Sequence, residues 1–263
     1  MRRIAKLISA GFLSCSSTYV VFNCLNPIQK VYASTFSSES PLVEEALRNY
    51  RDKITEWDFN WDGRNDKKGK ATRYIFLIRH GQYHMEKKDE NCHLTMLGHQ
   101  QTDLTGKRLA HMNYNYTKLI YSTMTRARES AQNILKHLKG LPSESSDLIR
   151  EGAPFPPEPP LVGWPDDPMQ FITEGVRIEK AFRTFFHRAD PTQESDSYEI
   201  FVCHANVIRY FVCRALQLPP EAWLRMSLDN GSITMLVVRP TGTVSIRCLG
   251  SSAFMPHEYS TVN

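Results

Sequence analysis

Apolar, β-rich runs alternate with amphipathic helical patterns along residues 73–250, and this alternation limits the fold more than any other feature of the sequence. Candidate strands are RYIFLIR, KLIYS and EIFVC, and a terminal hairpin is expected in SITMLVV and TVSIRCLG around Thr241-Gly242. Strands joined through helices form mostly parallel sheets that are covered on both faces. The sequence therefore predicts an α/β fold, a three-layer α/β/α arrangement with a mostly parallel central sheet.

The helical patterns give approximate bounds for the outer layers. Helices are expected over residues 94–112, 125–140, 171–189 and 207–216, with a short one at 218–226. The first long pattern after the second strand closes at Gly140, a residue typical of helix C-termini. Residues 141–168 are rich in proline and are expected to be irregular.

The overall composition excludes two classes of site. The formal net charge is only +4 and no long run of lysine or arginine occurs, so nucleic-acid binding is not expected. The six cysteines lack the C-x-x-C and cysteine/histidine spacings of zinc ligands, so no metal is expected. Cys203 and Cys213 lie in apolar runs and are predicted to be buried free thiols.

Residues 1–30 have the composition of a targeting or membrane segment. They begin with Arg2, Arg3 and Lys6, carry no charge between Lys6 and Lys30, and no acid precedes Glu39. A basic, serine-rich, acid-free segment is typical of mitochondrial presequences, and the uncharged stretch is long enough for a membrane anchor. A secretory signal fits less well, because no small-residue cleavage site closes the segment. We expect a membrane anchor with a mitochondrial address.

Residues 31–70 are predicted to connect this segment to the main domain at 71–263. Ser40 and Pro41 begin an amphipathic pattern that continues to Ile54 and runs into WDFNWD at 57–62. A helix would place Trp57 and Trp61 on one face. The tryptophans either cover this chain's own core or anchor another chain, since tryptophan is enriched in interface hot spots.

Two candidate strands end in histidine, His80 in FLIRHGQ and His204 in IFVCHAN. Because ligands bind at the carboxyl ends of the strands in open α/β sheets, these histidines can meet over one site. Arg79 precedes the first histidine, and Arg126 lies in the first turn after the third strand end. Guanidinium groups bind phosphate oxygens in pairs. The four residues therefore predict a metal-free phosphate site.

Five stretches taken in order, FLIRHGQ, LTMLGHQQTDLTGKRL, YSTMTRARES, LIREG and FVCHANVIR, resemble the motifs of the histidine phosphatase superfamily, the phosphoglycerate-mutase-like proteins. The resemblance implies that His80 attacks phosphorus and carries a phosphohistidine, while Arg79, Arg126 and His204 bind the phosphoryl oxygens. Gln82 and Ser122 are weaker candidates for the phosphate pocket. His84, His93 and His99 are expected to be solvated or structural.

The sequence gives several candidates for the general acid of this site. The LIREG motif indicates Glu151, whose pKa a loop environment can raise. The same irregular stretch also contains Glu144, Asp147 and Glu158, so the spacing alone leaves these alternatives open.

Several stretches, LIREGAP and NGSIT among them, are similar to one branch of the superfamily, the mitochondrial serine/threonine-protein phosphatases. The resemblance implies phosphoprotein substrates, no cofactor, and homo-oligomers formed through the WDFNWD residues Trp57, Asp58, Asn60, Trp61 and Asp62. A phosphoglycerate mutase is a first alternative, but mutases continue Arg-His-Gly with Glu-Ser and a Trp-Asn pair, where this chain has Gln82 to Met85. A small-molecule phosphatase and an anchored scaffold with little activity are the others.

Overall fold

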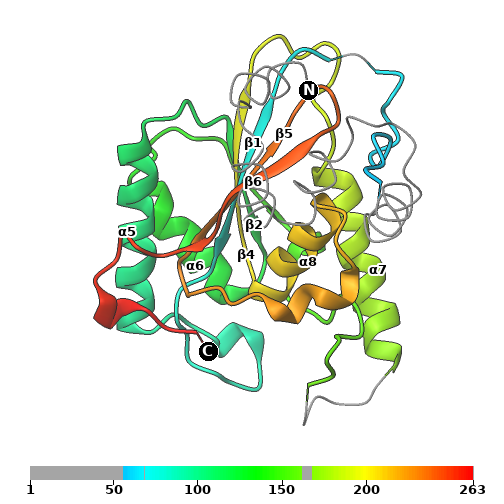
Figure 1. The fold of residues 1–263 in the computed structure, drawn as a ribbon. Coiled ribbons are helices and arrows are strands. Elements are labelled where there is room, and N and C mark those ends of the chain that lie inside the picture. Colours follow the sequence, from blue (N-terminus) through cyan, green and yellow to red (C-terminus); the bar gives the residue numbers. More distant parts are fainter. Residues whose placement is uncertain (1–55, 68, 162–167, 263) are drawn as a thin grey trace, which may run out of the picture. The chain divides into compact units, whose positions relative to one another are not determined.

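The computed structural model describes residues 56–67, 69–161 and 168–262 of the chain (Figure 1). The described residues of Asp58–Asn263 form one compact unit. The predicted anchor at 1–30 and the predicted helix from Ser40 to Ile54 lie outside the described residues. Within those residues, no helix has both the length and the apolar character needed to cross a membrane.

The centre of the main unit is a six-stranded sheet with the order β3-β2-β4-β1-β5-β6. The pairs β1–β4, β2–β4 and β2–β3 are parallel, whereas β1–β5 and β5–β6 are antiparallel. The mostly parallel sheet predicted from the sequence is therefore confirmed. The strands are β1 Arg73–Arg79, β2 Lys118–Ser122, β3 Ser143–Ser146, β4 Ser197–Cys203, β5 Ile233–Val238 and β6 Val244–Ser251.

Helices cover both faces of the sheet, because the alternating side chains of each central strand face opposite layers. Ile75 and Leu77 of β1 pack in a cluster with residues of α7 and α8, whereas Phe76 and Ile78 pack with residues of α5 and α6. Figure 1 shows these two helix pairs on opposite sides of the strands. The three-layer prediction is thus confirmed. The helices are α5 Met96–Met112, α6 Thr125–Leu135, α7 Pro168–Phe185 and α8 Ala205–Ala215.

Short 3₁₀ helices complete the unit, and several predicted bounds need correction. The stretch expected to be irregular contains the parallel edge strand β3, whose sequence SESS has no apolar residue to reveal it. Helix α6 ends at Leu135, and turns continue the chain to Gly140, which has a φ of 79°. The short helix expected at 218–226 is a 3₁₀ helix. The 3₁₀ helices are η1 Asp89–Asn91, η2 Asp147–Ile149, η3 Pro220–Arg225 and η4 His257–Tyr259.

Residues 59–62 of WDFNWD form turns and none of the six residues is helical, so the i, i+4 spacing does not place the two tryptophans on a common helical face. Trp61 lies against its own domain: its Nε1 donates to the carbonyl of Gly242 at 2.7 Å, and its ring centroid lies 5.9 Å from that of Phe182. The Asp62 carboxylate accepts hydrogen bonds from the guanidinium of Arg188, one at 2.5 Å and one at 3.1 Å.

Breaking the Asp62–Arg188 pair is expected to destabilise the domain strongly, because the two side chains are only 0% and 3% exposed. Burial raises the pKa of Asp62, but its hydrogen bonds and charge interaction with Arg188 outweigh burial and lower the pKa overall. Its stabilisation is therefore present at neutral pH and is lost as the pH falls through the lowered pKa. Asp62→Ala leaves Arg188 buried without its partner, which typically costs about 3–5 kcal/mol.

Urea unfolding of Asp62→Ala measures this loss directly. Asp58→Ala is the matched control, because Asp58 is exposed and, among the described residues, its carboxylate accepts only from the nearby Asn60 backbone N–H. The control is expected to cost less than about 1 kcal/mol. Equal losses in both variants would contradict a structural role for the buried pair.

Candidate active site

His80 follows the last residue of β1 and is 2% exposed. Its Nδ1 lies 2.8 Å from the carbonyl oxygen of Gly81, so the proton is assigned to Nδ1. Nε2 then carries the lone pair and accepts from Nε of Arg126 at 3.3 Å. Burial, together with the charges of Arg126 and Arg79, lowers the pKa of His80 well below its ordinary 6.5. His80 is thus a neutral imidazole with its unprotonated nitrogen beside a guanidinium.

The backbone around His80 is fixed by close contacts. A methyl group at Gly81 would lie 2.4 Å from the carbonyl oxygen of Gly98 in α5, so only glycine allows this approach. The Gly81 N–H donates to Ser130 Oγ at 3.0 Å. The carbonyl of His80 accepts from the Asn230 side chain and from the Gly231 N–H. The turn after β1 therefore holds the imidazole in one position.

Two buried arginines lie beside the imidazole. Arg126, in the first turn of α6, is 5% exposed, packs over the Tyr83 ring at 4.6 Å, and bonds to Asp89 at 3.3 Å. Arg79 donates to the Leu228 carbonyl at 2.5 Å. Burial lowers the pKa of Arg79 to about 10, which still leaves it charged at neutral pH. Both positive charges predicted at this edge of the sheet are therefore present.

His204 occupies the N-cap position of α8 directly after β4, and its ring centroid lies 5.1 Å from that of His80. Its Nε2 lies 2.8 Å from Ser122 Oγ, whereas its Nδ1 is buried without a hydrogen-bond partner among the described residues. Burial, followed by the neighbouring His80 and Arg126, lowers the pKa of His204 well below 6.5. Ser122 thus contacts this histidine, and the Nδ1 nitrogen remains able to bond a ligand.

Glu151 is partly buried beside this cluster. Its Oε1 accepts from the Gly152 N–H at 3.1 Å, and the carboxylate also accepts from the backbone N–H of Asn206 in α8. Burial raises the pKa of Glu151 above 4.5, although these hydrogen bonds and the charges of Arg126 and Arg79 oppose the rise. The carboxyl therefore keeps its proton to a higher pH than an exposed glutamate, as a general acid requires.

The other carboxylates of this stretch have different surroundings. Glu144 and Glu158 are exposed, and Asp147 is exposed with its carboxylate bonded to the Thr123 hydroxyl at 2.6 Å. The charge of Glu151, by contrast, acts on Arg79, and the charges of Arg126 and Arg79 act on Glu151. Glu151 is therefore the carboxyl that the geometry favours.

The remaining candidates lie at the edge of the cluster or outside it. The side-chain oxygen of Gln82 accepts from the Thr95 hydroxyl at 2.8 Å, which directs it toward the start of α5. His84 and His93 are exposed, and His93 pairs with Glu129. His99 bonds to Asn133. The prediction that these three histidines are solvated or structural is confirmed.

Cys203 and Cys213 are buried free thiols, as predicted. Cys203 immediately precedes His204, and burial raises the pKa of its thiol far above the ordinary range. The thiol next to the cluster is therefore protonated at neutral pH.

Sequence reasoning missed three residues of the site. Arg177 of α7 donates to the carbonyls of Leu148, Arg150 and Glu151, which fixes the loop that carries Glu151. Arg209 of α8 adds a further guanidinium, whose charge acts on Arg79 and which itself interacts with the charge of Glu151. Tyr83 lies edge-on to His80 at 5.2 Å. Of the three, only Arg209 could have been proposed from the sequence, because it lies one helical turn after the strand-end residues His204 and Ala205.

Comparison with protein families gives a match to the histidine phosphatase superfamily (branch 1), over residues 75–153 and 174–248. The two matched segments contain all five residues of the cluster. The match therefore covers more than half of the chain and includes the site.

Curated relatives are similar over most of their length. The chain is 54% identical to the mitochondrial serine/threonine-protein phosphatase PGAM5 of Xenopus laevis, over 77% of this chain and 82% of that protein. It is 50% identical to the protein of the same name from Homo sapiens, over 78% and 80%.

Among solved structures, phosphoglycerate mutase from Plasmodium falciparum is 33% identical, with a TM-score of 0.51 over 71% of this chain and 96% of that chain. A phosphoserine phosphatase from Entamoeba histolytica shares the fold at 16% identity, with a TM-score of 0.51 over 69% and 98%. The chain therefore belongs to the histidine phosphatase superfamily, and within it to the group of PGAM5-like proteins.

Proposed function

We propose that the chain is a protein serine/threonine phosphatase that hydrolyses phosphomonoesters through a phosphohistidine at His80. The observation that carries the proposal is the lone pair on Nε2 of a neutral His80, held beside Arg126, Arg79 and His204. The names of the curated relatives support serine and threonine phosphoesters on proteins as the substrates.

In the first step, the Nε2 lone pair of His80 attacks phosphorus and the bond from phosphorus to the serine or threonine oxygen breaks. The leaving oxygen takes the proton from Glu151, so the alcohol departs neutral. Arg79, Arg126 and His204 stabilise the charge on the three equatorial oxygens. The carbonyl of Gly81 accepts from Nδ1–H and supports the positive charge that develops on the ring.

In the second step, water attacks the phosphohistidine. The Glu151 carboxylate takes a proton from the water, the P–N bond breaks, and its electron pair returns to Nε2 of His80. Inorganic phosphate leaves, and Glu151 is again protonated. Proton and charge therefore balance over the cycle without an external reagent.

The charges of the site support a mechanism that needs no metal. Arg79 and Arg126 lie beside the nucleophile and the charge of Arg209 acts on Arg79, so a divalent cation would be repelled while a phosphate dianion is attracted. The buried Nδ1 of His204 has no partner within the described part of the chain. A phosphoryl oxygen would satisfy it through the Nδ1–H tautomer, and leaving such a group unsatisfied costs about 1–3 kcal/mol.

Purified full-length chain in detergent tests the proposal. Phosphoserine and phosphothreonine peptides are compared with 3-phosphoglycerate, and released phosphate and 2-phosphoglycerate are both measured. We expect phosphate release from the peptides. Mutase turnover without hydrolysis of either peptide would refute the proposal.

A phosphoglycerate mutase is the second candidate, favoured by the 33% identity to the Plasmodium falciparum enzyme. The residues after Arg-His-Gly speak against it, because Gln82 to Met85 replace the Glu-Ser and Trp-Asn pairs of mutases. The same assay separates the two activities.

We also propose that the protein is bound to a mitochondrial membrane through residues 1–30. The basic, acid-free segment and the mitochondrial designation of the relatives support this location. Residues 1–40 fused to a fluorescent protein should reach mitochondria and stay in the membrane fraction after carbonate extraction. Secretion of the fusion into the medium would refute the proposal.

Homo-oligomers are proposed to form through WDFNWD. The described contacts hold Trp61 and Asp62 against their own domain, so assembly requires the neighbouring copy to accept the same contacts in exchange. Phe59, at the turn of the motif, is 50% exposed and provides apolar surface for this contact.

A Trp61→Ala variant tests the assembly. Its mass by light scattering is expected to fall to that of a smaller species, with Asp190→Ala, an exposed change outside the motif, as the control. An unchanged mass in a folded variant would assign the motif to its own domain alone.

A further inference from the structure

An exposed stripe runs along the outer face of α7. The residues Met169, Ile172 and Val176 are separated by three and four positions, so they lie on one face of the helix, and each is more than half exposed. The same spacing continues to Lys180 and Arg183. The helix therefore presents an apolar half and a basic half on one solvent-facing side.

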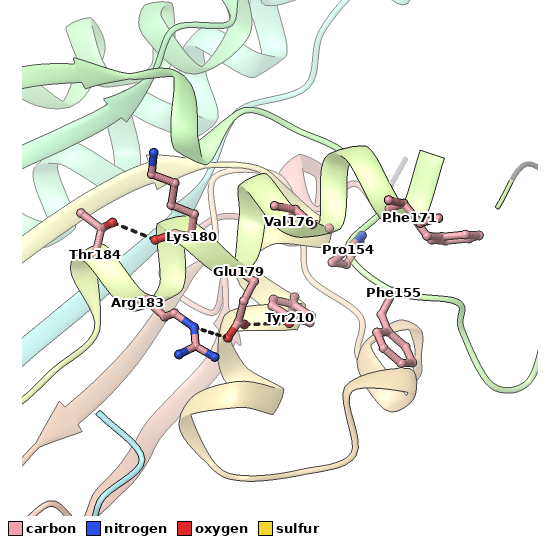
Figure 2. Close-up of a pocket in the computed structure, with 11 residues that line it drawn as sticks. Pro154, Phe155, Phe171, Val176, Glu179, Lys180, Arg183, Thr184 and Tyr210 are labelled. Carbon is pink, nitrogen blue, oxygen red and sulfur yellow. Dashed lines mark hydrogen bonds and ion pairs between the residues drawn. The ribbon is translucent and has the colours of Figure 1, made fainter. Parts of the chain in front are cut away.

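This stripe borders a groove of about 630 Å³ between α7, the loop after Glu151 and Tyr210 of α8. Figure 2 shows Phe155 and Phe171 at one end of the groove and Lys180, Arg183 and Thr184 at the other. The groove thus has an apolar end and a basic end.

The apolar end is attached to the loop that carries the candidate general acid. The Ala153 N–H donates to the Glu174 carboxylate of α7 at 2.5 Å, and the carbonyl of Phe155 accepts from Trp223 Nε1 at 2.8 Å. Phe155 follows Glu151 by four residues, so the two Cα atoms are at most about 14 Å apart. The groove therefore begins within about 14 Å of Glu151, and hydrogen bonds attach the loop between them to α7 and to Trp223.

We propose that this groove docks the polypeptide of the phosphoprotein substrate beside its phosphorylated residue, an inference that rests on the proposed function. The occupant is an extended segment with an apolar side chain near Phe155 and Phe171, and an acidic side chain that reaches Lys180 and Arg183. From Phe171 to Arg183 the helix rises about 18 Å. An extended chain covers that length in about five or six residues.

Continuity with the Glu151 loop favours a substrate over other occupants, because a docked segment leads directly to the reacting phosphate. The positive charge at the basic end of the groove requires an acidic residue at the matching position of the docked segment. Arg183 is paired with Glu179 at 2.9 Å, whereas Lys180 is exposed and has no ion pair within the described ranges. Lys180 is therefore the residue that selects for the acid.

The full-length protein with Val176→Glu or Lys180→Glu tests the docking. The substrates are a phosphoserine peptide with a leucine near the phosphoserine and a glutamate five or six residues beyond it, on either side, and p-nitrophenyl phosphate as a substrate too small to reach the groove. Val176→Glu is expected to raise KM for the peptide about tenfold, the effect of losing roughly 1.4 kcal/mol of apolar burial. The peptide's kcat and all constants for p-nitrophenyl phosphate should be unchanged.

Lys180→Glu tests whether reversing both charges restores docking. Relative to the unmodified protein, this variant should have a higher KM for the glutamate peptide and a lower KM for a peptide with lysine at that position. A general loss of folding cannot produce this reversal. Leu249→Glu, at an exposed apolar residue of β6, is the matched control and should change neither substrate.

Three outcomes would overturn the docking proposal: an unchanged KM for the peptide, an equal loss on p-nitrophenyl phosphate, or a changed mass by light scattering, which would assign the groove to a second copy of the chain. Failure of the proposed function is seen separately, since the unmodified protein would then hydrolyse p-nitrophenyl phosphate but neither peptide. That result would overturn both proposals before any variant is compared.

Discussion

A His80→Ala variant is expected to lose at least about a thousandfold in kcat on phosphopeptides, because it lacks the nitrogen that forms the covalent intermediate. The described contacts of His80 involve Nδ1 with Gly81 and Nε2 with Arg126, and neither holds the sheet together. The variant should therefore fold. Steady-state release of inorganic phosphate measures the loss, and circular dichroism confirms the fold.

The intermediate itself provides a second measurement. Rapid quenching of the unmodified protein with a radiolabelled substrate should trap a phosphoryl group that is stable to base and released by acid. His84→Ala is the matched control, because His84 is exposed and follows His80 by only four residues. Full activity in His80→Ala, or a base-stable label in that variant, would remove His80 from the mechanism.

A Glu151→Gln variant is expected to lose about a hundredfold to ten-thousandfold in kcat on phosphoserine peptides, the usual contribution of a general acid. The amide keeps the size of the side chain but cannot donate a proton to the leaving oxygen. With p-nitrophenyl phosphate the formation of the phosphohistidine should be much less affected, because p-nitrophenolate leaves without a proton. A burst of p-nitrophenol followed by slow turnover would show this difference.

The dependence of kcat on pH shows which protonation state of Glu151 is active. The protonated carboxyl is the active form, so kcat on the peptide should fall as the pH rises through the raised pKa of Glu151, and this decline should be absent in Glu151→Gln. On the acid side, activity should persist well below pH 6.5, because His80 stays neutral there. Equal losses in the rate of phosphohistidine formation from both substrates at every pH would contradict the general-acid role.

The central part of this site could be predicted because each of its members follows directly from a strand end. His80 and His204 each come immediately after a buried parallel strand, and Arg126 lies in the first turn after a third. Parallel strands end at the same edge of a sheet, so three local patterns suffice to bring distant residues together. The three-layer fold followed from the same alternation.

The supporting residues could not be predicted, because they act through backbone groups far away in the sequence. Arg177 reaches three carbonyls of the 148–151 loop from a helix surface that has no motif of its own. Strand β3 has only small polar residues and is held by its backbone pairing with β2. Neither long-range backbone contacts nor edge pairing leaves a periodic pattern in the sequence.

For WDFNWD, the sequence pattern was recognised but the predicted conformation was wrong. The spacing of the tryptophans indicated a helical face, yet residues 59–62 form turns. Their strongest contact is made by an acid, the Asp62 carboxylate that binds the buried Arg188. Because Arg188 is 126 positions away, the partner could not be identified from the motif alone.

The buried Cys203 thiol has a consequence for catalysis under oxidative stress. Peroxide inactivates phosphatases that use a cysteine nucleophile, because it oxidises the thiolate to sulfenic acid. Here the attacking atom is an imidazole nitrogen, and the thiol beside the site is 0% exposed and protonated at neutral pH. Such a site continues to remove phosphate while peroxide inactivates phosphatases that depend on a thiolate. On substrates that both kinds of phosphatase share, this protein would therefore account for more of the dephosphorylation when oxidants accumulate.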